Sequence, residues 1–424
     1  MTEPYSSAGS RRSGPCRLLV QICWSRRAYC GYDELWRVGP WQCVNARVRL
    51  HGRQCGSGRR GRYPRLSYRI AINGFGRIGR TAFRAWAQRA DAQSALTLAA
   101  INELADSETV AHLARYDSTH GRFSGTIRLE SGATVSEGSG SEQATNLIVN
   151  EQAILLLSQP QLDQLPWGEH AIDLVLECTG AFSDRATAEQ HLQAGAQRVL
   201  LSQPAEPTVD ATIVWGLNQA ILKGDETVVS AGSCTTNALC PVLQVIDEAF
   251  GIEAGTVTTV HSAMNDQPVL DAYHNTDLRK TRAAFQSIIP VDTGLAVGVP
   301  RILPQLQGKL TAHALRIPTL NVSAMDVAVY TQRPCSAAAV NDALKTAAEG
   351  PLAGILGFTT EPLASCDFNG ETRSSVVDAS QTQVSANRLL KVLIWFDNEW
   401  AYANRLLDIA LHFKGMAQGQ RRQP

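Results

Sequence analysis

The sequence predicts an α/β protein in which a doubly wound parallel sheet is followed by an α+β region with a mostly antiparallel sheet. Short apolar segments alternate with helix-like segments through residues 69–251, a pattern typical of doubly wound sheets. Beyond residue 261, β-like segments follow one another with few helices between them, which indicates an antiparallel sheet. The chain has 424 residues, 44% hydrophobic and 18% charged, so its length fits two domains and its composition excludes a disordered or collagen-like chain.

The formal net charge of zero hides a basic first segment and an acidic remainder. Residues 1–68 contain thirteen Arg, no Lys and three acidic residues, a net charge of +10, so the rest of the chain carries −10. Five of the ten Cys also lie in this segment, at spacings that form no CxxC pair: Cys16, Cys23, Cys30, Cys43 and Cys55. Four interpretations stay open: nucleic-acid binding, a transit peptide, a metal or disulfide knot, and a disordered or spurious extension from a misplaced start. We expect the last and leave residues 1–68 out of the fold.

The first ordered signal is a strand that runs into a glycine-rich turn and a helix. Apolar residues 70–72 predict a buried strand, and Gly74, Gly76 and Gly79 follow it as GxGxxG before a helix-like segment at 81–89. These glycines permit a tight turn, close approach of a pyrophosphate and close packing of the helix, whose N-terminus then faces the phosphates. The pattern predicts a dinucleotide-binding (Rossmann) domain.

An acidic residue after the second strand indicates which dinucleotide is bound. The apolar run 96–101 ends in Asn102 and Glu103, and Glu103 lies 24 residues after Gly79. A carboxylate at this spacing binds the ribose of NAD and repels the extra phosphate of NADP. The alternative is a solvated loop acid, but the complete strand–turn–helix–strand context favours NAD.

The alternation continues up to a cysteine at the start of a helix. We expect strands at 172–177, 198–202, 211–215 and 227–230, and a helix that ends near Ala194. Apolar residues then recur at helical spacing up to Gly251, and Cys234 precedes them among the capping residues Ser233, Thr235 and Thr236.

Cys234 is the predicted nucleophile, with His261 as its base. The dipole and free N–H groups of a helix N-terminus stabilise a thiolate. His261 follows the β-like segment 256–260 and begins the polar sequence HSAMNDQ. The alternatives are an inert buried cysteine and a structural histidine, but Cys234 lies at a polar helix start rather than in an apolar run.

From residue 69 to about residue 411 the chain resembles the glyceraldehyde-3-phosphate dehydrogenase superfamily. The similarity rests on motifs in the family's order: INGFGRIG (72–79), SCTTN (233–237), RAAFQSIIPVDTG (282–294), LRIPTLNVS (315–323) and WFDNEWAYANR (395–405). Further segments are similar to its erythrose-4-phosphate dehydrogenase branch: NELAD (102–106), HSAMNDQ (261–267), DAYH (271–274) and CDFN (366–369).

The resemblance implies oxidation of a sugar phosphate aldehyde through a covalent intermediate on Cys234. Cys234 would form a thiohemiacetal that becomes a thioester, and His261 would take the proton. With water as acceptor, erythrose 4-phosphate would give 4-phosphoerythronate, a step towards pyridoxal phosphate. With phosphate as acceptor, the enzyme would be a phosphorylating glyceraldehyde-3-phosphate dehydrogenase of glycolysis. A redox-sensing or nucleic-acid-binding protein without catalysis is the remaining alternative.

The resemblance also implies which residues bind the substrate and the cofactor. Those matching substrate positions are Ser233, Thr235, Lys280, Thr293, Gly294 and Arg316. Those matching NAD positions are Gly74, Gly76, Arg77, Ile78, Gly79, Glu103 and Asn398, of which Asn398 would orient the carboxamide. Relatives usually carry Arg where Lys280 stands, and often Arg near the adenine where Pro160 stands.

The implied architecture is an NAD-binding domain of residues 69–233, completed by a C-terminal helix in 398–424, and a catalytic domain of residues 234–397. The polar segment 263–288 would pack between the subunits of a homotetramer. No run of about 18 apolar residues occurs, so no transmembrane helix is expected. A cytoplasmic enzyme without a metal, a membrane anchor or a nucleic-acid partner is expected.

Overall fold

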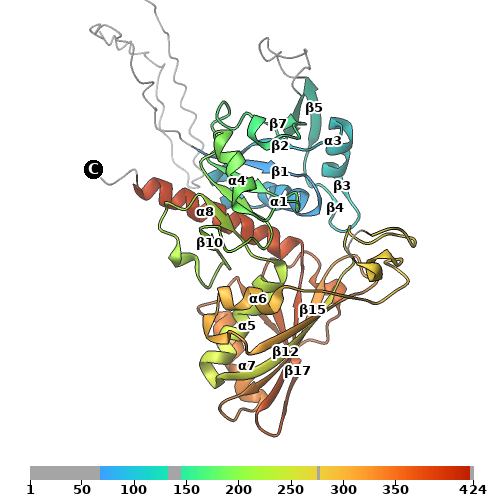
Figure 1. The fold of residues 1–424 in the computed structure, drawn as a ribbon, viewed down its shortest axis with the longest axis vertical. Coiled ribbons are helices and arrows are strands. Elements are labelled where there is room, and N and C mark those ends of the chain that lie inside the picture. Colours follow the sequence, from blue (N-terminus) through green and yellow to red (C-terminus); the bar gives the residue numbers. More distant parts are fainter. Residues whose placement is uncertain (1–66, 132–144, 275–276, 421–424) are drawn as a thin grey trace, which may run out of the picture. The chain divides into compact units, whose positions relative to one another are not determined.

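The structure is a computed structural model that describes residues 67–131, 145–274 and 277–420. The expectations for residues 1–66 therefore lie outside the described residues. Two large sheets organise the described chain (Figure 1), and each is built largely from one half of it.

The first sheet has nine strands and surrounds the glycine-rich turn. Its order is β10-β11-β9-β8-β1-β2-β7-β6-β5, and every pair from β10 to β7 is parallel. Its parallel strands are β1 (Tyr68–Asn73), β2 (Leu96–Asn102), β7 (Gln152–Leu157), β8 (Leu174–Glu177), β9 (Val199–Leu201), β10 (Ala211–Thr212) and β11 (Val228–Ser230). Successive strands leave β1 in both directions, so the order reverses beside β1, where ligands bind in such sheets. The predicted doubly wound sheet is confirmed.

One edge of this sheet departs from the parallel pattern. Strands β5 (Ile127–Ser131) and β6 (Thr145–Val149) pair antiparallel and continue into β7. Asn150 and Glu151 connect β6 to β7 with φ angles of 46° and 70°. Two left-handed residues in a two-residue connection fit the twist of an antiparallel hairpin, so the chain turns back at once instead of crossing over through a helix.

Helices cover the first sheet and bring the end of the chain back to its beginning. They are α1 (Arg77–Gln88), α2 (Ala90–Ala95), α3 (Ser107–Arg115) and α4 (Arg185–Gln193). The C-terminal helix α8 (Trp400–Gln420) packs along α1 (Figure 1) and places Leu406, Ile409 and Phe413 in the core beside Phe83 of α1. This helix lies within the range 398–424 in which a C-terminal helix was expected.

The second sheet has seven strands and is mostly antiparallel, as predicted. Its order is β13-β14-β12-β15-β18-β17-β16, with parallel pairing only for β12 with β14 and for β16 with β17 among these neighbours. The strands are β12 (Ile252–His261), β13 (Ile289–Val291), β14 (Leu310–Arg316), β15 (Ser323–Thr331), β16 (Leu356–Thr359), β17 (Ser375–Ser385) and β18 (Leu389–Phe396). Helices α5 (Cys234–Phe250) and α7 (Ala337–Glu349) pack on it through Leu243, Ile246, Val340 and Leu344.

The described residues contain neither a membrane-spanning helix nor a cluster of metal ligands. Within 67–131, 145–274 and 277–420, no helix is long and apolar enough to cross a membrane. The same part of the chain contains no group of three His, Cys, Asp or Glu side chains arranged to hold a metal ion.

Candidate active site

Cys234 is the first residue of α5, and the residues around it form the helix cap. The Ser233 hydroxyl accepts a hydrogen bond from the Thr236 backbone N–H at 3.0 Å, and the Ser233 N–H donates to the Thr236 hydroxyl at 2.8 Å. This reciprocal pair is a capping box, which satisfies two backbone donors and fixes the entry of the chain into the helix. The Cys234 side chain is therefore held at the helix N-terminus, as predicted.

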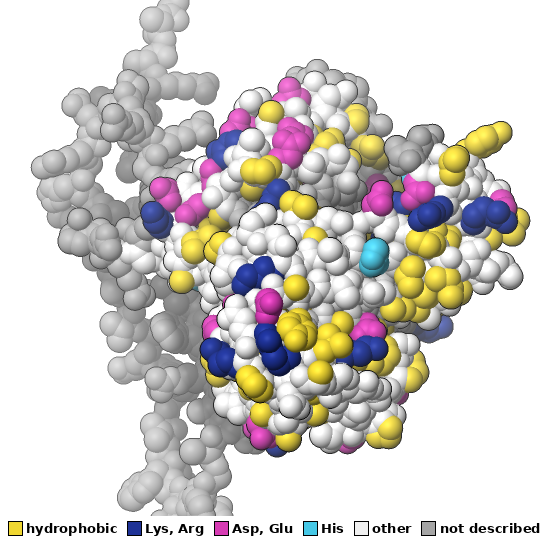
Figure 2. All heavy atoms as spheres, turned by 60° about the horizontal axis from the view of Figure 1, so that its bottom comes forward, with side chains coloured by type: hydrophobic (Ala, Val, Ile, Leu, Met, Phe, Trp, Pro, Cys, Tyr) yellow, Lys and Arg dark blue, Asp and Glu magenta, His cyan; other side chains and the backbone are white. Residues whose placement is uncertain are grey.

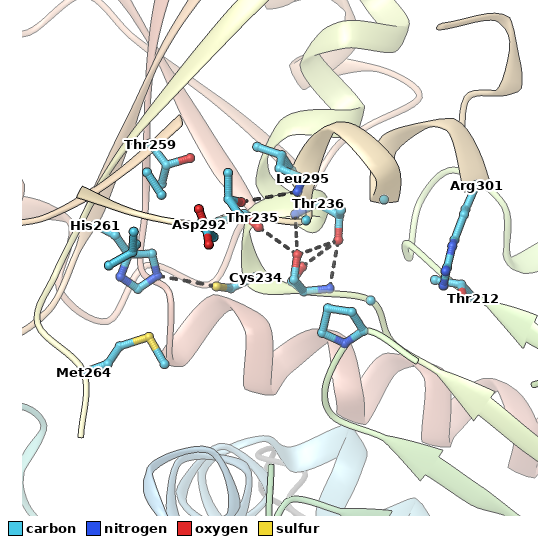
Figure 3. A pocket seen from close by; sticks show the side chains of 18 of the residues that line it. Thr212, Cys234, Thr235, Thr236, Thr259, His261, Met264, Asp292, Leu295 and Arg301 are labelled. Carbon is cyan, nitrogen blue, oxygen red and sulfur yellow. Dashed lines mark hydrogen bonds between the residues drawn. The ribbon is translucent and has the colours of Figure 1, made fainter. Parts of the chain in front are cut away.

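His261 is the last residue of β12 and faces Cys234. Its Nε2 lies 3.8 Å from the Cys234 sulfur (Figure 3), and its Nδ1 lies 2.9 Å from the Ser262 carbonyl oxygen. Strands β12 and β14 are parallel neighbours whose register pairs His261 with Arg316. This register brings the Arg316 Nη1 to 2.6 Å from the His261 Nδ1. Three of the predicted site residues are therefore in one constellation.

The electrostatics of the pair differ from the expected thiolate. Burial raises the pKa of the Cys234 thiol to about 11, although the positive charge of Arg316 and the backbone N–H groups of Thr235 and Cys234 act in the opposite direction. Burial, followed by the charge of Arg316, lowers the pKa of His261 to about 4. The helix start favours the thiolate but does not outweigh the loss of hydration. Without ligands, the pair therefore consists of a neutral thiol and a neutral imidazole.

A cavity of about 270 Å³ opens over the pair. It extends from His261 and Met264 to Arg301 and Thr212 (Figure 3). The predicted site residues that line it are Ser233, Cys234, Thr235, His261, Thr293, Gly294 and Arg316. Among the residues that the structure describes, the buried Arg316 Nε has no hydrogen-bond partner, and neither does the Thr259 hydroxyl. Arginine and hydroxyl groups around a cavity suit an anionic, oxygen-rich ligand.

Lys280 is not among the residues that line this cavity. It lies in a single 3-10 turn, Leu278–Thr281, and its Nζ is 2.8 Å from the Asp266 Oδ2. Burial acts against ionisation of Asp266, but the hydrogen bond from Lys280 lowers the pKa of that carboxyl. The predicted substrate residue is thus neutralised by an acid of the same loop. Asp266 was not predicted as a partner of Lys280, although it lies only five residues after His261 in the sequence.

The glycine-rich turn has the shape that a dinucleotide requires. Gly74 has a φ of +86°, and a Cβ there would lie 2.7 Å from the Thr179 backbone. A Cβ on Gly79 would lie 2.1 Å from the Gly74 carbonyl oxygen, so only glycine lets α1 approach the turn. Nothing lies within 4 Å of a Cβ built on Gly76, and no side chain caps α1 at this residue. Space and unpaired N–H groups at the helix start fit a pyrophosphate.

The remaining NAD positions surround this turn. Ile78 follows as the second residue of α1 and is half-buried. Glu103 comes directly after β2 and accepts hydrogen bonds at 2.8 Å from the N–H groups of Phe75 and Leu104. The carboxylate therefore stands beside the glycine-rich turn at the carboxyl end of the second strand, which is where a ribose is bound in this type of sheet.

Arg77 has a different environment from the one expected. Its Nη1 lies 2.6 Å from the Asp117 Oδ2, and its Nε lies 2.9 Å from the Glu399 Oε1. His120 contributes a further contact of 3.0 Å from its Nε2 to the Glu399 Oε2. The guanidinium thus joins the start of α1 to the residue after Asn398, so its hydrogen bonds go to two carboxylates. Asp117 and Glu399 lie 40 and 322 residues after Arg77 in the sequence, and sequence reasoning missed both of them as well as His120.

Asn398 is oriented by two serine hydroxyls that the sequence analysis also missed. Ser262 and Ser323 both donate to the Asn398 Oδ1, at 3.1 and 2.9 Å, and all three residues are buried. With its oxygen used in this way, the amide presents Nδ2 as its donor. A donor here fits the carboxamide oxygen of a nicotinamide. The only available signal was that Ser262 follows the predicted base and Ser323 ends a quoted motif.

Comparison with protein-family models agrees with this geometry. Residues 68–185 match the model described as glyceraldehyde 3-phosphate dehydrogenase, NAD binding domain. Residues 233–398 match the model described as glyceraldehyde 3-phosphate dehydrogenase, C-terminal domain. The two matches together cover more than half of the chain and contain both the glycine-rich turn and the Cys234–His261 pair. The chain therefore belongs to the glyceraldehyde-3-phosphate dehydrogenase family and is an NAD-dependent oxidoreductase that acts on an aldehyde.

Proposed function

We propose that this protein oxidises D-erythrose 4-phosphate to 4-phosphoerythronate, through a thioester on Cys234. The observation that carries the proposal is the cavity in which a thiol, an imidazole and an arginine lie together: Cys234 and His261 are 3.8 Å apart, and Arg316 contacts His261. A nucleophile, a base and a cation for the phosphate or the substrate oxygens are what this reaction needs.

In the first step, the Cys234 sulfur forms a bond to the aldehyde carbon. The thiol proton passes to the His261 Nε2 and then to the former carbonyl oxygen, which gives a thiohemiacetal. Because the pKa values of the two groups hold both in the neutral state, proton transfer accompanies the attack rather than preceding it. The Cys234 backbone N–H and the His261 imidazole stabilise the negative charge that develops on the oxygen.

In the second step, the thiohemiacetal loses a hydride and a proton and becomes a thioester. His261 takes the proton from the hydroxyl. NAD, when bound, supplies the chemistry of a hydride acceptor. Glu103 would hold its ribose, Asn398 its carboxamide, and the start of α1 its pyrophosphate. Water then attacks the thioester carbon, which releases the acid and returns the thiol.

The tetrose substrate is supported by the sequence around the cavity. The segments NELAD, HSAMNDQ with DAYH, and CDFN are similar to the erythrose-4-phosphate dehydrogenase branch, and Met264 of HSAMNDQ lines the cavity. The product would serve the formation of pyridoxal phosphate, and we propose a cytoplasmic location on the same resemblance.

The domain limits and the oligomer are proposals as well. We propose an NAD-binding domain of residues 69–233 with 398–424, and a catalytic domain of 234–397. The separate cores around β1 and α8 and around α5 and β15 support this division. We also propose a homotetramer in which the segment 263–288 lies between subunits.

Exposed apolar side chains in that segment support the homotetramer. Val269, Leu270, Tyr273, Leu278 and Ile288 are between 66% and 102% exposed. Figure 2 shows hydrophobic side chains gathered at the side of the molecule where this segment lies in Figure 1. Contact with another subunit would remove this apolar surface from water.

A comparison of two aldehydes tests the proposed substrate. NADH formation by the full chain is measured with D-erythrose 4-phosphate and with D-glyceraldehyde 3-phosphate, each with and without inorganic phosphate. We expect the higher kcat/KM with the tetrose and no need for phosphate, and no turnover by Cys234→Ala, which should still bind NAD. Faster, phosphate-dependent turnover of the triose would show instead a phosphorylating glyceraldehyde-3-phosphate dehydrogenase.

A further inference from the structure

The His261 Nδ1 faces two groups that make opposite demands on it. The Ser262 carbonyl oxygen, at 2.9 Å, can only accept a hydrogen bond, so this contact requires a proton on Nδ1. The Arg316 Nη1, at 2.6 Å, can only donate, so this contact requires a lone pair on Nδ1. A neutral imidazole carries one proton, and therefore its Nδ1 satisfies one of the two neighbours at a time.

The choice at Nδ1 decides what Nε2 can do to the thiol. If Nδ1 accepts from Arg316, the proton is on Nε2, which then points an N–H group at the Cys234 sulfur and cannot take its proton. If Nδ1 donates to the Ser262 carbonyl, Nε2 has the lone pair that a base needs. The shorter of the two contacts is the one to Arg316, so the arrangement without ligand favours the form that is unable to act as a base.

Arg316 is also poised to leave this contact. Its buried Nε has no partner in the described part of the chain, and its Nη1 is 3.4 Å from the Ser262 carbonyl oxygen, beyond a good hydrogen bond. No acidic side chain forms an ion pair with Arg316 among the described residues. A guanidinium with unsatisfied donors in a cavity wall forms stronger hydrogen bonds with an incoming anion than with a neutral imidazole.

We propose that Arg316 is a positioning residue for His261, and that an anion in the cavity switches the base on. A phosphate or carboxylate group that binds Arg316 draws the guanidinium away from Nδ1. The N–H bond at Nε2 then breaks and one at Nδ1 forms, by exchange of a proton with solvent, so the imidazole stays neutral. Nδ1 now donates to the Ser262 carbonyl, and Nε2 is ready to accept the thiol proton.

This inference rests on the proposed roles of Cys234 and His261 and adds a condition to them. The free thiol stays protonated until an anionic substrate is in place, which protects it from other electrophiles. The charged or titratable neighbours that act on His261 are Arg316, Asp266 and Glu399, together with Cys234 itself. Only Arg316 of these contacts Nδ1, so its substitution isolates the effect.

The test is the tautomer of His261 in the full chain, read from the 15N spectrum of labelled imidazole without aldehyde. The signal is assigned by its loss in His261→Asn, and inorganic phosphate is the probe. Without phosphate we expect the proton on Nε2, and with saturating phosphate on Nδ1, so that the two nitrogen signals exchange positions. Arg316→Met should carry the proton on Nδ1 under both conditions.

Arg301→Met is the matched control, because Arg301 lines the same cavity but bonds to the Ala205 carbonyl at the end away from His261. It should behave as the unchanged protein. Phosphate should also raise the rate of Cys234 alkylation by neutral iodoacetamide, by up to about 100-fold if the base becomes fully active, and not in Arg316→Met.

The outcomes separate this inference from the proposed function. A proton on Nδ1 in the phosphate-free protein, or the same tautomer in Arg316→Met, would overturn the inference whatever the enzyme's substrate. A bound phosphate that leaves the tautomer on Nε2 would overturn the role of the anion. Failure of NADH formation with both aldehydes would contradict the proposed function and leave the tautomer comparison standing.

Discussion

Two buried histidines in this molecule are built for opposite purposes. His191 in α4 is completely buried, and His261 at the end of β12 is 6% exposed. Both imidazoles have a polar group at each nitrogen. The difference lies in whether those groups leave the ring one arrangement or two.

His191 has one arrangement. Its Nδ1 lies 2.9 Å from the Trp167 Nε1, which can only donate, so Nδ1 accepts and Nε2 carries the proton. Nε2 in turn lies 3.1 Å from the Glu177 carboxylate, which also accepts from Asn73 at 2.5 Å and from the Thr179 N–H at 2.9 Å. Every polar atom of the ring has a partner of the right kind, and this fixes the carboxyl end of β8 next to Gly74.

The neighbours of His261 do not fix the position of its ring proton in this way. Its Nδ1 lies between an acceptor, the Ser262 carbonyl, and a donor, the Arg316 guanidinium, and its Nε2 faces a thiol at 3.8 Å instead of a carboxylate. A fully satisfied network gives rigidity, whereas the ring of His261 has a second arrangement available, in which Nδ1 donates to the Ser262 carbonyl instead of accepting from Arg316. Burial does not distinguish the two histidines, because it is similar for His191 and His261. The reactive histidine is recognised instead by ring nitrogens whose hydrogen-bond partners do not fix the position of the proton.

The largest expected effect is the loss of enzymatic activity when His261 is replaced. His261→Asn should lower kcat by about 10²- to 10⁴-fold, the usual contribution of a positioned base. The free energy of unfolding at pH 7 should change by only about 1 kcal/mol, because the Nδ1 of the neutral ring forms a hydrogen bond with only one of its two neighbours, Arg316 or the Ser262 carbonyl, at a time. Steady-state NADH formation and urea unfolding measure the two effects. A variant with most of its turnover intact would remove His261 from the mechanism.

Replacement of His191 should give the reverse result. His191→Leu leaves the Glu177 carboxylate and the Trp167 N–H each one partner short, which should lower the free energy of unfolding by about 3 kcal/mol. The kcat of the protein that remains folded should stay within a few-fold of the original. Urea unfolding, followed by assays well below the midpoint, measures both. A loss of kcat as large as in His261→Asn would break the comparison.

The sequence predicts most of what local pattern controls. The strand before Gly74, the helix after Cys234 and the doubly wound sheet follow from periodicity and glycine spacing, and the structure confirms them. The hairpin at Asn150 was not predicted, because its antiparallel pairing depends on a two-residue turn within one apolar stretch.

Contacts between residues that are distant in the sequence could not be predicted from local sequence patterns. Arg316 meets His261 through the parallel register of β12 and β14, strands that are 55 residues apart at this pair. Arg77 meets Glu399 through the return of the C-terminal helix. The family resemblance implied that Lys280 binds the substrate, but Lys280 forms an ion pair with Asp266 of the same loop.

The pH dependence of stability should also distinguish His261. Because its pKa of about 4 in the folded protein lies below the usual value of 6.5, the unfolded chain takes up a proton between pH 6.5 and 4 that the folded chain does not. The free energy of unfolding therefore falls as the pH falls through this window, by about 3 kcal/mol for this group.

Urea unfolding from pH 7 to 4 measures this effect as a difference between two proteins. His261→Asn should lose about 3 kcal/mol less stability than the unchanged protein over this range, since all other groups contribute equally to both. Parallel curves would show that His261 is protonated in the folded state well above pH 4, and the neutral pair would be refuted.

The smallest predicted effect separates the two roles of Ser262. Its backbone carbonyl serves His261, while its hydroxyl donates to the Asn398 Oδ1 at 3.1 Å. Ser262→Ala keeps the carbonyl and removes one of the two hydroxyls that orient the amide. The loss of about 1 kcal/mol should raise the KM for NAD about five-fold and leave kcat nearly unchanged.

A double-mutant cycle shows whether the hydroxyl acts through Asn398. In the Asn398→Ala background, Ser262→Ala should have no further effect on the KM for NAD, because the group it orients is already absent. An equal effect in both backgrounds would mean that the Ser262 hydroxyl acts on the cofactor by another route. A fall in kcat in the single variant would mean that the Ser262 side chain also supports His261. The role of the hydroxyl in cofactor binding and the role of the carbonyl in positioning the base would then not be separate at this residue.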